Sequence, residues 1–132
     1  DKAGSGGSNV KMANTSTYVS DGGNVSQNTV QGLAKGWINF NGTGTIAARD
    51  SYNFSSLTDN GPGDYTVGVT NDMSSADYAA LATCGLDSGG SRAFCSTDTH
   101  TTTSVKVLLR QAASNNNIDA ADVQSGLLGD LA

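Results

Sequence analysis

Most of the chain alternates between apolar and polar residues over short stretches, which glycine, asparagine and proline separate. In AKGWINFN, Ile38 and Phe40 fall on one face. Trp37, Asn39 and Asn41 fall on the other. Because successive side chains of a strand point to opposite faces, this period of two predicts a half-buried β-strand. The turn signal NGTG comes next, and TIAARDSYN is the expected second strand.

A second hairpin is expected around NGPG. Pro62 presets φ at the second position of a turn, and Gly63 accepts the positive φ of the third, so the sequence predicts a type II turn. SSLTD and DYTVGVT flank this turn as strands. In the latter, Tyr65, Val67 and Val69 alternate and are expected to face the core.

Further strands are expected along the rest of the chain. YAALATCGL is a candidate strand, although its alanines also suit a short helix, and RAFCST is expected to pair with it. In TTTSVKVLLRQ, Val105, Val107 and Leu109 share one face, and VQSGLLGDLA can complete a sheet. About six to eight short strands at this spacing predict an all-β fold, an antiparallel β-sandwich or a jelly-roll-like domain.

The first 32 residues differ from this pattern. They contain few large apolar residues, among them Tyr18, Val19 and Val25, and these are separated by Gly, Ser and Asn. Such a segment cannot bury enough surface alone to offset its ordering entropy. The sequence therefore predicts an extended arm or linker over 1–32, which either stays flexible or orders against a neighbouring chain, and a sandwich domain over 33–132.

Composition narrows the classes of partner. Hydrophobic residues make up 36% of the chain and charged residues 14%. Seven basic and twelve acidic residues give a formal net charge of −5, which is the wrong sign for binding nucleic acid. No apolar run approaches the roughly 20 residues that cross a bilayer, so no membrane insertion is expected.

The two cysteines would lie opposite each other in a two-residue hairpin centred on Gly89 and Gly90. Cys84 and Cys95 would then form a hydrogen-bonded pair with Cα atoms about 5.5 Å apart, a position that strains a disulfide. A disulfide and two reduced, buried thiols both remain open. With His100 as the only histidine, no metal site is expected, because a closed zinc shell needs four ligands.

Candidate catalytic groups are sparse. His100 could nominally join a hydrolase triad, but no G-x-S-x-G elbow accompanies it. A polysaccharide hydrolase would need carboxylates about 5 to 9.5 Å apart in a groove, and the candidates for them are Asp59, Asp64, Asp72 and Asp77. We expect no enzymatic activity and no cofactor.

Five aromatic residues bear on ligand binding. Any one of them could stack on a sugar ring, but core packing is the favoured interpretation, since aromatic side chains dominate cores. They are Trp37, Tyr52, Phe54, Tyr65 and Tyr78.

Three runs of the chain have a pattern specific enough to compare with a family. They are GLAKGWINFNGTGTIAARDSYNFSSLTDNGPGDYTV, NDMSSADYAALA and the closing GLLGDLA. Together they resemble a domain that recurs in bacteriophage tail-fibre and related virion proteins, and the resemblance extends over residues 32–132. The chain departs from the family pattern with Gly36 in place of alanine and with Pro62 in the hairpin. It departs more over 83–117, which is variable in this family.

The resemblance implies a distal fibre, capsid-fibre or decoration domain of a virion that is assembled in the host cytoplasm, commonly as a trimer. Residues 1–32 would tether it to other virion proteins, and its ligand would be a host-surface glycan or protein. No catalytic residue carries over. The alternative is a purely structural trimerising cap, adaptor or decoration protein without a receptor. Variable loops on a constant scaffold suit recognition, so the candidate contacts lie at the expected hairpin tip and the Thr-rich loop: Asp87, Ser88, Arg92, Asp98, Thr99 and His100.

Overall fold

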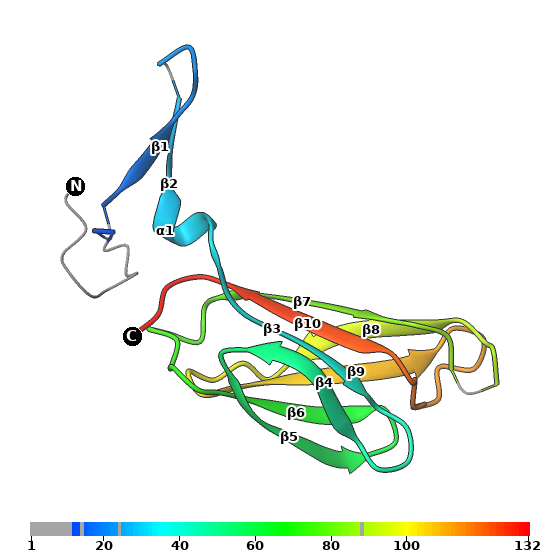
Figure 1. Cartoon of the computed structure of the whole chain (residues 1–132). Coiled ribbons are helices and arrows are strands. Elements are labelled where there is room, and N and C mark those ends of the chain that lie inside the picture. The colour runs from blue at the N-terminus through cyan, green and yellow to red at the C-terminus, as the bar shows by residue number, and fades with distance from the viewer. Residues whose placement is uncertain (1–11, 14, 24, 88) are drawn as a thin grey trace.

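The computed structural model describes residues 12–13, 15–23, 25–87 and 89–132. Its fold is all-β, and its main body is a sandwich of two four-stranded antiparallel sheets (Figure 1). This confirms the β-sandwich expected from the alternating pattern. One sheet has the strand order β4 (Ala47–Tyr52), β3 (Ala34–Asn41), β10 (Val123–Leu128) and β7 (Ala79–Cys84). The other has the order β5 (Phe54–Gly61), β6 (Asp64–Val69), β9 (Ser104–Gln111) and β8 (Ala93–Asp98).

The core lies between the two sheets and is built from the inward-facing alternate residues of the central strands. The predicted inward residues of β6 and β9 are all buried there. Phe40 of β3 packs against Tyr65 of β6 with ring centroids 5.2 Å apart and planes at 71°. The fully buried large side chains are Tyr65, Phe40, Met73, Leu109, Leu127, Val67, Val105, Val107 and Val123.

A buried tyrosine hydroxyl closes one end of this core. Tyr65 donates to the carbonyl of Gly42 (2.6 Å) and to the carboxylate of Asp119 (2.7 Å). Burial raises the pKa of Tyr65 well above its ordinary value, and the hydrogen bond and negative charge of Asp119 raise it further. The same carboxylate accepts from the N–H of Gly63, so it joins the β5–β6 turn to the segment that precedes β10.

The predicted hairpins at the amino-terminal half of the sandwich are confirmed. β3 pairs with β4, and β5 pairs with β6 in an antiparallel ladder that ends at the NGPG turn. Gly63 has a φ of 61°, as the third position of a type II turn requires.

The expected hairpin between the two cysteine-bearing strands is wrong. β7 pairs with β10 and β8 pairs with β9, so the two strands lie in opposite sheets. The connection does not make a two-residue turn, because Asp87 organises it differently. The N–H of Asp87 donates to the carbonyl of Ser91, and its carboxylate accepts from the N–H groups of Gly89 and Ser91. The chain thereby crosses from one sheet to the other.

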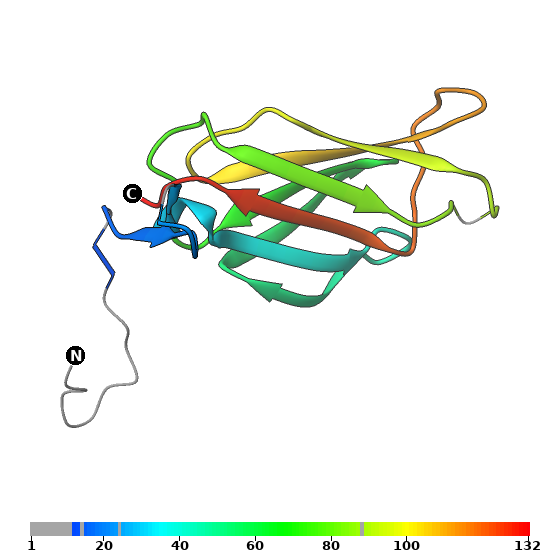
Figure 2. The same cartoon turned by 90° about the horizontal axis from the view of Figure 1, so that it is seen from above.

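The segment before the sandwich has structure of its own. β1 (Thr17–Val19) and β2 (Ser26–Asn28) pair as an antiparallel hairpin, and α1 (Thr29–Gly32) follows. The hairpin stands away from the sandwich, close to the end at which residue 132 lies (Figures 1 and 2). In the part of the chain described here, no helix has the length and apolar character to cross a membrane.

Candidate functional site

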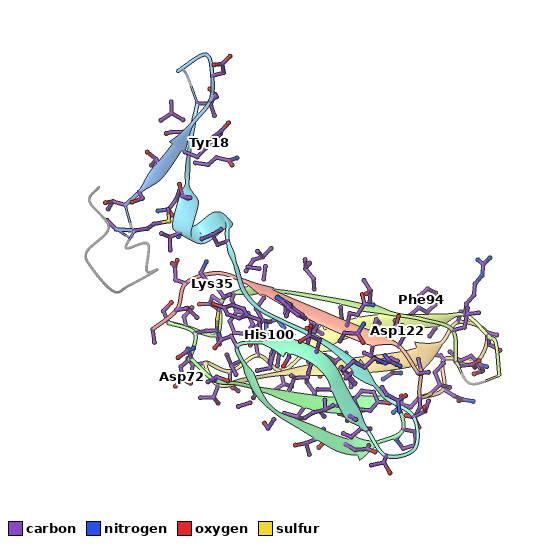
Figure 3. The ribbon with its side chains drawn as sticks, viewed as in Figure 1. Tyr18, Lys35, Asp72, Phe94, His100 and Asp122 are labelled. Carbon is purple, nitrogen blue, oxygen red and sulfur yellow. The ribbon has the colours of Figure 1, made fainter. Side chains whose placement is uncertain are left out.

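The predicted contact residues do not gather at one place. Asp87 and Arg92 precede β8, whereas Asp98, Thr99 and His100 lie at its far end or just beyond it. Arg92 and Asp98 are six residues apart along an extended strand, which separates the two groups by about 20 Å. Figure 3 shows the same separation, with Phe94 and His100 toward opposite ends of the sandwich. Ser88 lies outside the described residues.

Two of these residues have clear structural roles. The carboxylate of Asp87 holds its own turn and accepts from the Gln111 amide (3.1 Å). His100 stacks on the ring of Tyr78, with centroids 5.0 Å apart and planes at 13°. Tyr78 in turn donates to the carbonyls of Thr101 and Ser104. These contacts organise the loops: the carboxylate of Asp87 is engaged by three donors, and His100 is half-buried.

The four carboxylates that a polysaccharide hydrolase would require are also divided. Asp59 and Asp64 lie at the β5–β6 turn, whereas Asp72 and Asp77 follow the other end of β6. Asp64 is engaged by Lys106 (2.8 Å) and by the amide of Asn60. Among the described residues, no group of three or more His, Cys or Asp side chains is arranged to hold a metal ion.

An uncovered face of the β4–β3–β10–β7 sheet offers a different arrangement. The ladder sets Trp37 opposite Tyr52 on one side and opposite Gly126 on the other, and Gly126 opposite Leu81. We call these four residues the apolar row. Trp37, Tyr52 and Leu81 are 42%, 57% and 59% exposed. In Figure 2 the strands β3, β10 and β7 lie in front, and no described element covers them.

Hydrogen-bonding side chains form a second row across the same face. Asn39 of β3, Gln124 of β10 and Thr83 of β7 lie in register beside the apolar row. Thr83 donates to the Gln124 amide oxygen (3.1 Å), and the Gln124 nitrogen donates to Asp122 (3.2 Å). Asn39 also donates to Asp122 (3.1 Å), which completes the connection between the strands. We call Asn39, Gln124, Thr83 and Asp122, together with Arg49, the polar row.

Arg49 neutralises the carboxylate in this row. Its guanidinium lies 3.2 Å from Asp122 and donates to the side-chain oxygen of Asn39 (3.0 Å). Both charged side chains are about half exposed, at 46% and 49%, so the ion pair adds little stability. Its effect is to fix the orientation of the amides and to leave the face without a strong net charge.

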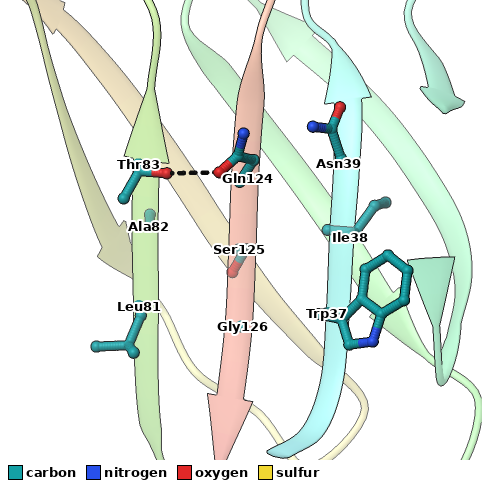
Figure 4. Close-up of a pocket in the computed structure, with 9 residues that line it drawn as sticks. All are labelled: Trp37, Ile38, Asn39, Leu81, Ala82, Thr83, Gln124, Ser125 and Gly126. Atoms are coloured by element: carbon teal, nitrogen blue, oxygen red, sulfur yellow. Dashed lines mark hydrogen bonds between the residues drawn. The ribbon is translucent and has the colours of Figure 1, made fainter. Parts of the chain in front are cut away.

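A shallow groove runs between the two sides of this face. It has a volume of about 340 Å³, and Trp37, Leu81, Thr83 and Gln124 are among its lining residues. Gly126 forms the floor, flanked by Trp37 and Leu81 on the neighbouring strands (Figure 4). A Cβ at Gly126 would meet its nearest neighbour, the carbonyl oxygen of Gly36, at 3.9 Å, so a larger residue fits the strand but would fill the groove.

The sequence contained part of this site. Alternation placed Trp37 and Asn39 together on an outward face, and the structure confirms that placement. The five aromatic residues differ in burial in the structure: Tyr65 and Tyr78 are buried and Phe54 is half-buried, whereas Trp37 and Tyr52 are exposed. The contribution of β7 and β10 could not be anticipated, because no local pattern states which strands flank β10.

No family model, curated protein or solved structure matches the chain. What the structure defines is an antiparallel β-sandwich whose β4–β3–β10–β7 sheet has a partly aromatic outer face that no described element covers.

Proposed function

We propose that this chain is an attachment domain of a bacteriophage fibre, which binds a host-surface glycan through the uncovered face of the β4–β3–β10–β7 sheet. The virion setting rests on the sequence resemblance described above. The observation that carries the ligand class is the apolar row beside the polar row. A binding role, without catalysis, agrees with a face rich in amides and poor in groups able to transfer protons.

The two rows match the chemistry of a sugar ring. A pyranose presents C–H groups on one face and hydroxyls around its rim, so it needs an apolar surface beside fixed donors and acceptors. Trp37 supplies a large rigid surface with a polar N–H. Asn39 and Gln124 supply amide groups, each with a carbonyl acceptor and two N–H donors. Hydrogen bonds from both amides to Asp122 hold them in place before a ligand arrives, which lowers the entropic cost of binding.

The single tryptophan of the chain provides a direct test. The full chain would be titrated with purified bacterial capsular polysaccharides and lipopolysaccharide oligosaccharides while Trp37 fluorescence is followed. Gly126→Val keeps the reporter and fills the groove, so at least about a tenfold loss of affinity is expected, a change of about 1.4 kcal/mol. Phe94→Ala is the matched control, because it removes an aromatic side chain of similar exposure (65%) away from the groove.

The results separate the alternatives. Loss of binding in Gly126→Val with retention in Phe94→Ala supports the face. Undiminished binding in Gly126→Val would show that the ligand does not bind in this groove. Substitution of Arg92 and of His100 would then test the two groups of loop residues separately. If no glycan changes the fluorescence or is retained on the immobilised chain, the proposed ligand class is wrong.

A purely structural role is the second candidate, and the β1–β2 hairpin favours it. An isolated two-stranded hairpin is marginally stable in water, yet this one exposes Tyr18, Val19 and Val25. Those side chains would be buried if the arm packed against other copies in a trimer or against another virion protein. Light scattering of the full chain and of Tyr18→Ser with Val25→Ser would test this: a trimer that becomes a monomer supports assembly through the arm, whereas a monomer in both excludes self-assembly of the chain alone at that concentration.

A further inference from the structure

The two edges of the sandwich are held in different ways. At one edge the chain passes directly from β4 to β5. The side-chain amide of Asn53, between these strands, donates to the carbonyl of Lys35 in one sheet and to the carbonyl of Asn71, which follows β6 of the other sheet. At the other edge β7 and β8 have no backbone ladder between them, because each pairs only with the central strand of its own sheet. A hydrogen bond from Thr97 to the Ala80 carbonyl spans this edge at 3.5 Å, well beyond the ordinary range of about 2.5 to 3.0 Å, so it is weak.

Cys84 and Cys95 meet across this open edge. Cys84 ends β7 and Cys95 lies in β8, and both are half-buried against the core. The two thiols are near enough to interact electrostatically, and both cysteines are free in the structure. Cα atoms of the two strands come within 8 Å of each other, which is closer than the roughly 10 Å between stacked sheets. The two sheets therefore approach each other more closely at this edge than stacked sheets usually do.

The positions of both cysteines are set by the sheets. Cys84 lies opposite Val123 of β10, and Cys95 lies opposite Leu109 of β9. Both partners are fully buried in central strands. The two sulfur atoms are thus brought together by the packing of the sandwich, and the connecting segment 85–94 has no need to form a regular hairpin.

We propose that Cys84 and Cys95 are a disulfide site that joins the two sheets when the protein meets an oxidising medium. With glutathione disulfide as the oxidant, one thiolate attacks it and releases one glutathione thiolate. The second cysteine thiolate then attacks the mixed disulfide and releases the other. Two thiols are oxidised to one disulfide, and one glutathione disulfide is reduced to two glutathione molecules.

Burial makes this reaction slow at neutral pH. It raises the pKa of Cys95, and the neighbouring Cys84 raises it further. Because the thiolate is the nucleophile, the rate is expected to increase with pH. Once formed, the bridge fixes the end of β7, the strand that carries Leu81 and Thr83 of the uncovered face. The inference concerns the thiols alone and holds whatever ligand that face binds.

The test uses the full chain incubated with glutathione disulfide and then unfolded in denaturant with a thiol-alkylating reagent. The expected product is a monomer that has lost the mass of two hydrogen atoms and takes up no alkyl group. Closing a loop of roughly a dozen residues should raise the folding equilibrium constant by about 100-fold relative to the same chain after dithiothreitol treatment. Cys84→Ala with Cys95→Ala is the control, and its stability should not respond to either reagent.

Two results would overturn the proposal. One is a monomer that still takes up two alkyl groups after prolonged oxidation at alkaline pH. The other is a bridge that forms only between chains, seen as a dimer on a non-reducing gel.

Discussion

The turn at Gly63 allows the packing of the sandwich to be tested with a closely matched control. Gly63 and Gly44 have the same φ, 61°, in the left-handed region that disfavours residues with a Cβ. A Cβ on Gly63 would lie 2.6 Å from the carbonyl oxygen of Ile118 and 2.9 Å from its nitrogen, closer than real Cβ atoms come. A Cβ on Gly44 would meet nothing within 4 Å. The two positions therefore share the conformational cost and differ in the space around them.

Gly44→Ala should lower the free energy of unfolding by about 1 to 2 kcal/mol, from the left-handed conformation alone. Gly63→Ala adds backbone displacement in a packed region, which costs about 1 to 3 kcal/mol more. Urea unfolding followed by circular dichroism measures both. With a slope of about 1 to 3 kcal/mol per molar urea, the midpoint of Gly63→Ala should lie roughly 1 M below that of Gly44→Ala. Equal midpoints would refute the close packing of the turn against the segment around Ile118.

Three further substitutions test polar groups. Tyr65→Phe should cost about 1 to 3 kcal/mol because it removes the buried hydroxyl that bonds to Asp119 and to the Gly42 carbonyl. Since folding raises the pKa of Tyr65, this contribution is fully present below pH about 10 and declines progressively above it, so the difference between the two unfolding curves should narrow as the pH rises beyond about 10. Ser125→Ala should increase the free energy of unfolding by about 1 kcal/mol, because the buried Ser125 hydroxyl has no partner among the described residues. Thermal unfolding should show this as a higher melting temperature. Burial alone would raise the pKa of Asp64, but hydrogen bonds from Lys106 and a neighbouring amide, with the lysine's charge, lower it. Lys106→Met should therefore cost up to about 1 kcal/mol at pH 7, and the loss should disappear as the pH falls through the lowered pKa.

Local patterns predicted the strands well where one face is buried. The inward sets of β3, β6 and β9 follow directly from alternation, because a one-residue error would place the whole set in water. The NGPG turn was equally clear, since the geometry of its third position favours glycine. In both cases the deciding interactions lie within a few residues of each other in the sequence.

The pairing of distant strands could not be read in the same way. Two strands joined by a short glycine-rich segment usually form a hairpin, and that expectation was wrong for β7 and β8. The decisive partners, β10 and β9, follow later in the chain, and their buried residues hold each cysteine-bearing strand in a different sheet. The uncovered face depends on this same long-range arrangement, which is why only its β3 portion was within reach of the sequence. For Tyr52 the favoured interpretation was core packing, whereas its side chain is exposed.

The difference between the two edges has a dynamic consequence. Asn53 adopts a φ of 61° and bonds to Lys35 and to Asn71, so the β4–β5 corner is tied to the strands on both sides. With the thiols reduced, the facing strands β7 and β8 share, among the described residues, only the long hydrogen bond from Thr97 to the Ala80 carbonyl. Transient separation of the two sheets should therefore begin at the β7–β8 edge, while the β4–β5 corner stays closed. Backbone amides of β7 and β8 should then exchange with deuterium sooner than those of β4 and β5. Oxidation of the cysteine pair would remove that preference.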